Sequence, residues 1–306
     1  MKNVLKVNGL CKKYKRKTVL NGVNMTIKQG DIYGFVGKNG AGKTTLIRII
    51  SGLTDADEGS FELFGIKSGS NGIDAARKKV CTMVESPAIY PDLTARDNLK
   101  MQCLITNKPF YCIDELLSFV GLADTGKKRA CDFSLGMRQR LGIAIALVNE
   151  PKLMLLDEPI NGLDPEGIKQ VRDLLLKLHS EKKVTILISS HILTELSLFA
   201  TRYGFIDNGT IVKEASQEEI RLETEENCYI EADDIEKAQD ILTKLGYEPV
   251  PSEKGLRIRK DIDLMKVCAT FAENGIRLKK HICSSIDLET YFMNLIGGGN
   301  NEPDKS

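Results

Sequence analysis

The hydrophobic pattern in the first third of the chain predicts several strands and then a helix. Apolar and polar residues alternate over residues 5–7 and 19–27, and residues 31–36 are mostly apolar. Alternation of this kind indicates half-buried strands, and a Gly-containing turn signal at 29–31 separates the second strand from the third. A glycine-rich segment follows, residues 44–50 have helical character, and 57–65 reads as a turn with a short strand.

The middle of the chain predicts helices between buried strands. Residues 93–149 are mostly helical in pattern, with apolar side chains such as Leu116, Leu117 and Val120 at helical spacing. Residues 153–156 are wholly apolar and 184–189 nearly so, with a helical pattern over 167–180 between them. Such apolar runs are typical of strands buried in a parallel sheet. Strand, helix and strand in this order predict a parallel α/β core.

The composition changes near residue 214. Between Glu214 and Glu236 there are ten acidic residues and one basic residue, Arg221. A run of this kind predicts a solvated connection and a domain boundary. Beyond it, three strands and three helices predict a small α+β domain over 221–296 after a first domain over 1–220. The polar, glycine-rich residues 297–306 are expected to be disordered.

Composition and charge exclude several classes of protein. The 306 residues are 42% apolar and 28% charged, an ordinary globular balance. Lys and Arg number 43 against 42 for Asp and Glu, so no net field draws the chain to nucleic acid or anionic lipid. The longest nearly uninterrupted apolar stretch, residues 141–148, is far too short to cross a bilayer. The first residues lack the features of a secretory signal, so we expect a cytoplasmic protein.

The cysteines give no sign of a metal or redox centre. None of them forms a Cys-x-x-Cys pair or has a His partner at zinc spacing, so we expect buried free thiols in a reducing compartment. The eight are Cys11, Cys81, Cys103, Cys112, Cys131, Cys228, Cys268 and Cys283.

A phosphate-binding loop follows the third predicted strand. Residues 37–44 fit the pattern Gly-x4-Gly-Lys-Thr, in which glycines let successive backbone N–H groups wrap phosphate oxygens. The next helix directs its positive end at the same charge. Lys43 can reach the β- and γ-phosphates and the Thr44 hydroxyl can bind Mg²⁺. The predicted nucleotide-binding residues here are Gly37, Lys38, Asn39, Gly40, Ala41, Gly42, Lys43, Thr44 and Thr45.

Two acidic residues end the strand predicted over 153–157. Asp157 stands at the sheet edge, where it can hold Mg²⁺ through water, and Glu158 can orient or deprotonate an attacking water. The alternative is a pair of solvated carboxylates. The four apolar residues before them favour a buried edge and a catalytic role.

Further segments identify a family. Residues 133–140 lie between these two motifs, and residues 161–164 and 189–191 follow them. In this order, the segments resemble those of the ATP-binding cassette (ABC) family over roughly residues 1–220. The resemblance implies an α/β P-loop NTPase cassette with a mixed sheet core, an antiparallel β subdomain and a helical subdomain at about 86–150. It also implies a sandwich dimer with a second cassette subunit, either identical or a close paralogue.

The resemblance assigns roles to individual residues. It implies that Ser134 and the Gly136 backbone contact the γ-phosphate of the opposite site, and that Asp164 links the two subunits. It makes Glu158 the general base and His191 the residue that senses the γ-phosphate, a task that suits a side chain able to donate and accept hydrogen bonds. A lone His is more often structural, but His191 follows a buried strand.

The resemblance also assigns roles to Tyr14 and Glu85. Tyr14 stands where the family places an aromatic ring against adenine. The lysines around Tyr14 favour a different interpretation, in which they protect the edge of a hairpin.

Glu85 replaces a Gln that in most of the family contacts Mg²⁺ and faces the membrane subunit. This Glu, and the terminal helix at 286–295, resemble the bacitracin-resistance and lantibiotic-immunity cassettes. Glu85 is therefore expected to serve both Mg²⁺ and a basic group on the partner, unless it is a tolerated variant.

The signature segment departs from the common family pattern at two positions. Leu135 and Met137 stand where the family usually has Gly and Gln, although Ser134 and Gly136 are kept. Such variants resemble those of bacterial exporter cassettes that work with a separate membrane subunit, so ATPase activity is still expected.

These features predict an ATP-hydrolysing exporter subunit. ATP and Mg²⁺ are the expected cofactors, and an integral membrane permease at the inner face of the cell membrane is the expected partner. The resemblance points to an antimicrobial peptide as cargo. The alternative is a soluble ABC ATPase acting on DNA or ribosomes, which usually has two cassettes in one chain or a long coiled coil. The balanced charge also gives no help to nucleic-acid binding, so no nucleic acid partner is expected. A simple nucleotide kinase would lack the segment at 133–140.

Overall fold

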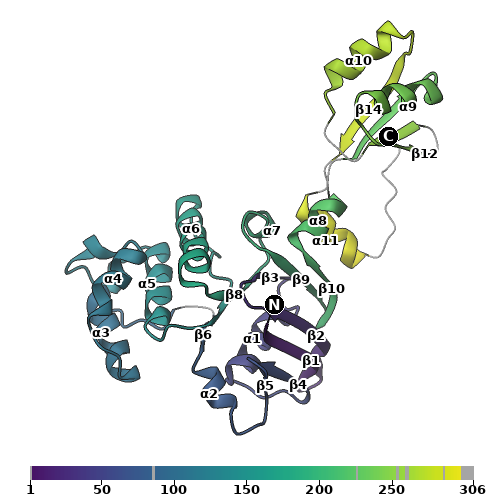
Figure 1. The fold of residues 1–306 in the computed structure, drawn as a ribbon. Coiled ribbons are helices and arrows are strands. Elements are labelled where there is room, and N and C mark those ends of the chain that lie inside the picture. The colour runs from purple at the N-terminus through teal and green to yellow at the C-terminus, as the bar shows by residue number, and fades with distance from the viewer. Residues whose placement is uncertain are drawn as a thin grey trace. The chain divides into compact units, whose positions relative to one another are not determined.

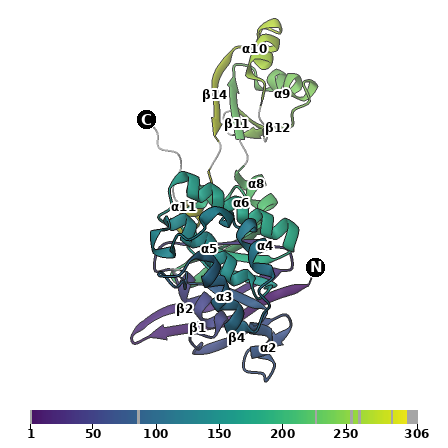
Figure 2. The ribbon, with the colours of Figure 1, turned by 90° about the vertical axis from the view of Figure 1, so that its left-hand side faces the viewer.

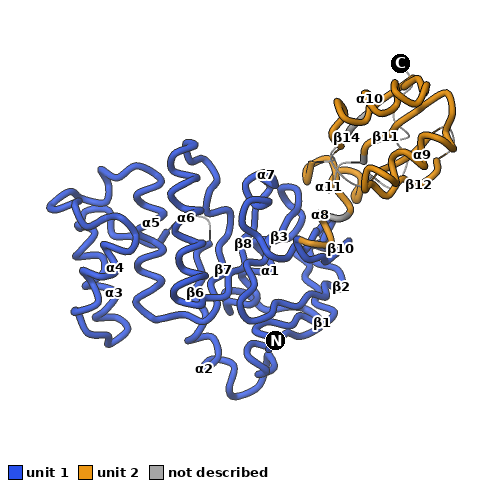
Figure 3. Tube along the Cα trace, turned by 45° about the horizontal axis from the view of Figure 1, so that its top comes forward, with its two compact units in different colours: residues 1–217 blue, residues 218–306 orange. Residues whose placement is uncertain are grey.

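The computed structural model describes residues 2–84, 87–224, 227–252, 255–258, 262–284 and 287–297. The chain divides into two compact units, residues 1–217 and 218–306 (Figure 3). The predicted disordered tail lies outside the described residues from position 298 onward.

The first unit begins with an antiparallel sheet in the order β2-β1-β4-β5. Its strands are β1 (Asn3–Tyr14), β2 (Lys17–Lys28), β4 (Glu58–Leu63) and β5 (Ile66–Lys67). The first hairpin is longer than the hydrophobic pattern predicted, because backbone pairing continues through polar residues to the Tyr14–Lys17 pair. The sheet therefore carries Tyr14 to the very end of β1.

A six-stranded sheet forms the centre of the first unit (Figure 1). Its order is β10-β9-β3-β8-β7-β6, and all neighbours run parallel except β9 and β10. The predicted α/β fold with a mixed sheet is thus confirmed. The strands are β3 (Ile32–Val36), β6 (Val80–Met83), β7 (Leu153–Asp157), β8 (Thr185–Ser190), β9 (Arg202–Asp207) and β10 (Thr210–Ser216).

Helix α1 (Lys43–Ser51) is packed into the core that joins these two sheets. Its Leu46, Ile47 and Ile50 side chains are buried in one apolar cluster with side chains of β1 and β2 and of β7 and β8. Burying one such side chain contributes about 1.5–3 kcal/mol. This packing fixes the start of α1, and with it the loop that precedes the helix.

The helices of the region between β6 and β7 form a group on the β6 side of the sheet (Figure 1). In Figure 2 the helices of the region between β6 and β7 stand in front of the sheets. They are α3 (Ala95–Thr106), α4 (Cys112–Phe119), the 3₁₀ turns η1 (Ala123–Thr125) and η2 (Ala130–Asp132), and α5 (Leu135–Leu147). The remaining helices of the first unit are α2 (Ile73–Arg77), α6 (Pro165–Lys182) and α7 (Leu193–Leu196).

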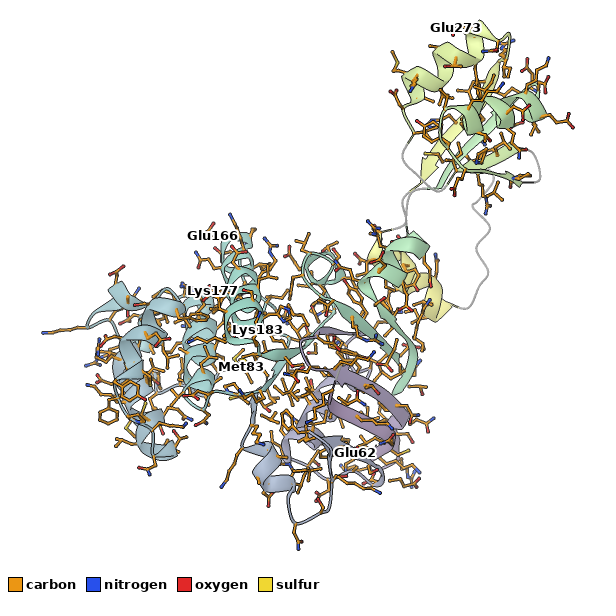
Figure 4. The ribbon with its side chains drawn as sticks, viewed as in Figure 1. Glu62, Met83, Glu166, Lys177, Lys183 and Glu273 are labelled. Atoms are coloured by element: carbon orange, nitrogen blue, oxygen red, sulfur yellow. The ribbon has the colours of Figure 1, made fainter. Side chains whose placement is uncertain are left out.

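Charges at the two ends of α6 suit the helix dipole. Glu166, labelled in Figure 4, lies in the first turn, and Lys182 lies in the last turn. An acidic group near the N-terminus and basic groups near the C-terminus stabilise a helix. Asp164 caps the start, so this helix begins at a defined residue.

Helix α5 packs closely on the end of β6. A Cβ added to Gly142 would lie 2.5 Å from Pro87 Cβ and 3.0 Å from Met83 Sδ, so only glycine fits (Figure 4 labels Met83). The close contact joins the helical region to the central sheet.

The second unit contains an antiparallel sheet in the order β12-β13-β11-β14. Two helices, α9 and α10, supply Ala238, Leu242, Val267 and Phe271 to its apolar core. The connection predicted around residues 214–236 contains helix α8, which its acidic composition did not predict. The elements are α8 (Gln217–Thr224), β11 (Asn227–Ala232), α9 (Ile235–Lys244), β12 (Pro249–Ser252), β13 (Gly255–Ile258), α10 (Leu264–Glu273), β14 (Leu278–Ser284) and α11 (Leu288–Gly297).

The cysteines differ from the prediction of buried free thiols. Cys228 is disulfide-bonded. It lies in β11 opposite Cys283 of β14, a sheet register that spacing along the sequence does not reveal. Among the six cysteines described as free, Cys103 is buried and Cys131 is exposed. The sequence pattern predicts which helix or strand contains a cysteine. The burial of the cysteine side chain depends on what packs against that helix or strand.

Within the described residues, no helix is both long enough and apolar enough to cross a membrane.

Candidate nucleotide-binding and hydrolysis site

The glycine-rich loop lies between β3 and α1, where the sequence predicted it. Gly42 caps α1 with a φ of 111°, in the region that favours glycine. A Cβ added there would lie 2.6 Å from Leu20 Cδ2 and 2.7 Å from the Val19 carbonyl oxygen. The loop therefore needs glycine at this position both for its backbone conformation and for its close approach to β2.

A cavity of about 260 Å³ lies over the loop. Eight of the residues that line this cavity were predicted from the sequence as nucleotide-binding or catalytic residues. Val19 of β2 was not predicted, because an apolar residue in a strand gives no signal of a binding site. Gly37 and Ala41 do not line it. The lining consists of Val19, Lys38, Asn39, Gly40, Gly42, Lys43, Thr44, Thr45 and Glu158.

Lys43 is a buried cation with several partners. Its side-chain Nζ donates to the carbonyl oxygens of Gly37 at 2.5 Å and Lys38 at 3.3 Å. The same Nζ lies 3.2 Å from Glu158 Oε1. A buried charge requires such partners, and all of them place the ammonium group inside the phosphate loop.

Asp157 is held by two hydroxyl groups. Thr44 Oγ1 donates to its Oδ2 at 2.6 Å, and Ser189 Oγ donates to its Oδ1 at 2.5 Å. The Asp157 residue is 3% exposed. Because the Thr44 proton points to Asp157, the oxygen of Thr44 keeps its lone pairs for another partner.

The residues at this position fit a magnesium ion. Mg²⁺ prefers oxygen ligands and is usually bound by one or two carboxylates together with the phosphates of the substrate. The Thr44 hydroxyl and the Asp157 carboxyl group supply that chemistry. Glu85, the third predicted ligand, lies outside the described residues. Among the residues that are described, no cluster of three or more His, Cys, Asp or Glu side chains could hold a metal by itself.

Glu158 follows β7 directly and has a φ of 49°, which is uncommon for a residue with a side chain. Its N–H donates to the Ser189 carbonyl oxygen at 3.2 Å and to Ser189 Oγ at 3.0 Å. Its Oε2 lies 2.8 Å from Nδ1 of His191, just beyond β8. The structure thus gathers the phosphate loop, both acidic residues and His191 at one edge of the sheet.

The signature residues form a second group at the starts of α5 and α6. Ser134 caps α5 and Asp164 caps α6, each by accepting a backbone N–H at 3.2 Å. A Cβ on Gly136 would lie 3.5 Å from Gly167 Cα, so the two helix starts are close together. None of the three predicted residues lines the cavity over the phosphate loop. Their role across a dimer stays a prediction.

Tyr14 stands at the end of β1 with 44% of its surface exposed. Asp57 holds the strand before it by accepting from Lys12 Nζ at 2.8 Å and from the Lys13 N–H at 2.6 Å. The hydrogen bond from Lys12 holds the pKa of Asp57 below its ordinary value. Lys12 Nζ also lies 5.5 Å from the centre of the Tyr14 ring. The Tyr14 ring is therefore accessible to solvent, and the contacts of Asp57 hold the strand that carries it.

Comparison with known sequences identifies the family. Residues 20–161 match the sequence profile of the family described as ABC transporter. The chain is 39% identical over 305 residues to the bacitracin transport ATP-binding protein BcrA of Bacillus licheniformis, covering 98% of this chain and 99% of that protein. This chain belongs to the ABC transporter family. It is also 43% identical over 211 residues to the lantibiotic transport ATP-binding protein SrtF of Streptococcus pyogenes, covering 69% of this ABC protein and 90% of SrtF.

Solved structures agree with this assignment. The ABC protein resembles cbiO1 of Clostridium perfringens, part of the transporter complex cbiONQ, with a TM-score of 0.67, 26% identity and coverage of 80% of this chain and 98% of cbiO1. It resembles the cassette MJ0796 bound to ADP and Pi with a TM-score of 0.62, 26% identity and coverage of 70% and 98%. The predicted ATP-binding and ATP-hydrolysing cassette is confirmed. The relatives named here are transport proteins and give no support to action on DNA or ribosomes.

Proposed function

We propose that this ABC ATPase drives a bacterial exporter for peptide antibiotics of the bacitracin or lantibiotic type. The observation that carries the proposal is the extent of the similarity to BcrA, which covers 98% of the chain and so includes the second unit. The solved cassettes cbiO1 and MJ0796 match 80% and 70% of the chain. The similarity to a bacitracin transport protein therefore extends further along the chain and includes the second unit.

The proposed partners are an integral membrane permease and a second cassette subunit. The names of BcrA and SrtF describe ATP-binding proteins of transport systems, and MJ0796 is described as a dimer. Ser134, Gly136 and Asp164, which stand apart from the phosphate loop, would serve the ATP of the other subunit. The proposed location is the inner face of the cell membrane, bound to the permease.

The geometry supports a mechanism in which binding and positioning do most of the work. The backbone N–H groups of the loop and the Lys43 ammonium group would hold the phosphates. Thr44 and Asp157 would hold Mg²⁺, which when bound supplies positive charge beside the phosphates. Glu158 would orient the attacking water and accept its proton, and His191 would contact the γ-phosphate while fixing the Glu158 carboxylate.

Co-purification and a resistance assay test the proposal. The tagged chain is expressed with the membrane protein encoded beside it, and the inhibitory concentrations of bacitracin and of a lantibiotic are measured. We expect the membrane protein to co-purify and the inhibitory concentration of at least one peptide to rise. The Glu158→Gln variant should still co-purify but give no protection. Equal sensitivity with and without the wild-type pair would overturn the cargo, and purification without any membrane protein would overturn the exporter.

A further inference from the structure

Ser189 stands where two strands deliver the candidate catalytic residues. Strands β7 and β8 are parallel, and Asp157 pairs directly with Ser189 at their carboxyl ends. Ser189 is fully buried, with 0% of its surface exposed. Three apolar residues of β8, 186–188, thus lead to a buried hydroxyl group beside Asp157.

The hydroxyl of Ser189 is used in two directions. Its proton goes to Asp157 Oδ1, at 2.5 Å, and its oxygen accepts the Glu158 N–H, at 3.0 Å. A hydroxyl group has one proton to donate and two lone pairs, so both contacts are made at once. The Ser189 side chain therefore binds two adjacent acidic residues. It contacts the carboxyl group of Asp157 and the backbone N–H of Glu158.

We propose that Ser189 is a positioning residue for ATP hydrolysis, which keeps Asp157 aligned with Thr44 and Glu158 aligned with Lys43 and His191. The inference rests on the proposed function of this site. With Oδ1 held by Ser189, the Asp157 carboxyl group is fixed in rotation and Oδ2 faces the Thr44 hydroxyl. Without that hydrogen bond, Oδ1 would be a buried acceptor with one donor fewer, and the carboxyl group would turn to find another.

The contact with Glu158 serves the second acidic residue. A φ of 49° costs free energy for a residue with a side chain and persists only where the surroundings impose it. The Ser189 hydroxyl and carbonyl oxygens both accept the Glu158 N–H and so impose this conformation. The conformation in turn directs the Glu158 carboxylate to Lys43 and His191.

Two variants of Ser189 separate hydrogen bonding from packing. Ser189→Ala removes the hydroxyl, and Ser189→Cys keeps a side chain of similar size with only a weak donor. Thr185→Val is the matched control, because Thr185 is also buried in β8 and its hydroxyl also accepts a backbone N–H, that of Gly30 at 3.1 Å, at the other end of the strand. Thermal unfolding of each full-length variant reports how much stability is lost.

The decisive measurement is binding of a fluorescent ATP analogue at increasing Mg²⁺ concentration, which needs no turnover. We compare the Mg²⁺ concentration that produces half of the gain in nucleotide affinity caused by Mg²⁺. In both Ser189 variants this concentration should be about 10- to 100-fold higher than in wild type, as is typical when a group that orients a metal ligand is lost. Affinity without Mg²⁺ should stay within about twofold of wild type, since the phosphate loop is unchanged. ATPase activity at saturating Mg²⁺ should also fall, through Glu158.

The outcomes distinguish this proposal from the function on which it rests. A wild-type Mg²⁺ requirement and turnover in Ser189→Ala would overturn the positioning role, as would full function in Ser189→Cys. An equal shift in Thr185→Val would also overturn it, because the effect would then follow stability alone. If the wild-type chain itself shows no Mg²⁺-dependent nucleotide binding, the proposed function fails together with the role of Ser189.

Discussion

Lys43 and Glu158 form an ion pair within the cavity over the phosphate loop, with Nζ 3.2 Å from Oε1. The cation comes from the first residue of α1 and the carboxylate from the residue after β7. The lysine proposed to bind phosphate is thus paired with the residue proposed to activate water. A phosphate group that binds Lys43 competes with Glu158 for the same ammonium, so nucleotide binding and release of the base become linked.

This link leads to the first prediction, for Glu158→Gln. Turnover should fall by about 10²- to 10⁴-fold, since the amide cannot accept the proton of the attacking water. ATP affinity should rise by about threefold to tenfold, because a carboxylate that competes for Lys43 and repels phosphate is lost, a gain of ~1 kcal/mol for a partly exposed pair.

ATPase rates and fluorescent-nucleotide titrations measure both quantities. Glu166→Gln, at an exposed carboxylate in the first turn of α6, is the control and should match wild type in both. Normal turnover by Glu158→Gln would disprove the role as base, and weaker ATP binding would disprove the competition.

A second prediction concerns Tyr14. The ring is exposed at the end of β1, and the contacts of Asp57 with Lys12 and Lys13 hold the strand behind it. Stacking of an aromatic ring on a base contributes about 1–3 kcal/mol, so Tyr14→Ala should weaken ATP binding by roughly fivefold to 100-fold. Inorganic triphosphate, which has no base, should bind equally to both proteins in competition titrations. Tyr14→Phe keeps the ring and serves as control; unchanged ATP affinity in Tyr14→Ala would place adenine elsewhere.

The residues predicted well from the sequence are those with local signals. The spacing of Gly37, Gly42 and Lys43 marks the loop, and the apolar run before Asp157 marks β7, because each pattern sits in a few consecutive positions. What the sequence missed depends on backbone pairing between strands. Ser189 contacts Asp157 only because β7 and β8 end in register, and the extension of β1 to Tyr14 depends on its pairing with β2.

A third prediction follows from the cysteines, whose burial could not be inferred from spacing. Burial raises the pKa of the Cys81 thiol to about 11, whereas Cys131 is exposed. At pH 8 a thiol with that pKa is about 0.1% thiolate, the form that reacts. Brief treatment of the native protein with iodoacetamide at pH 8 should therefore label Cys131 well before Cys81, as read by peptide mass spectrometry. Because an acid with a raised pKa gains its charge only at higher pH, Cys81 labelling should increase steeply between pH 8 and 10. Early labelling of Cys81 at pH 8 would contradict this.

The last prediction concerns Asn98 of α3, which is 1% exposed. Its Oδ1 accepts the Tyr90 N–H at 2.7 Å, and its Nδ2 donates to the carbonyl oxygens of Tyr90 at 3.0 Å and Thr94 at 2.9 Å. One side chain thus satisfies the backbone of the segment that leads into α3. Asn98→Ala should lower the free energy of unfolding by about 1–2 kcal/mol, because these partly buried backbone groups lose their hydrogen-bond partner.

Asn98→Asp tests which half of the amide matters. A carboxylate still accepts the Tyr90 N–H but cannot donate, so it would face two carbonyl oxygens without a proton and should destabilise the protein at least as much as Asn98→Ala at pH 7. Urea unfolding measures the change, with the less buried Gln102→Ala on the same helix expected within about 0.5 kcal/mol of wild type. If Asn98→Asp were as stable as wild type, the hydrogen bonds that Asn98 donates to Tyr90 and Thr94 would contribute nothing to stability.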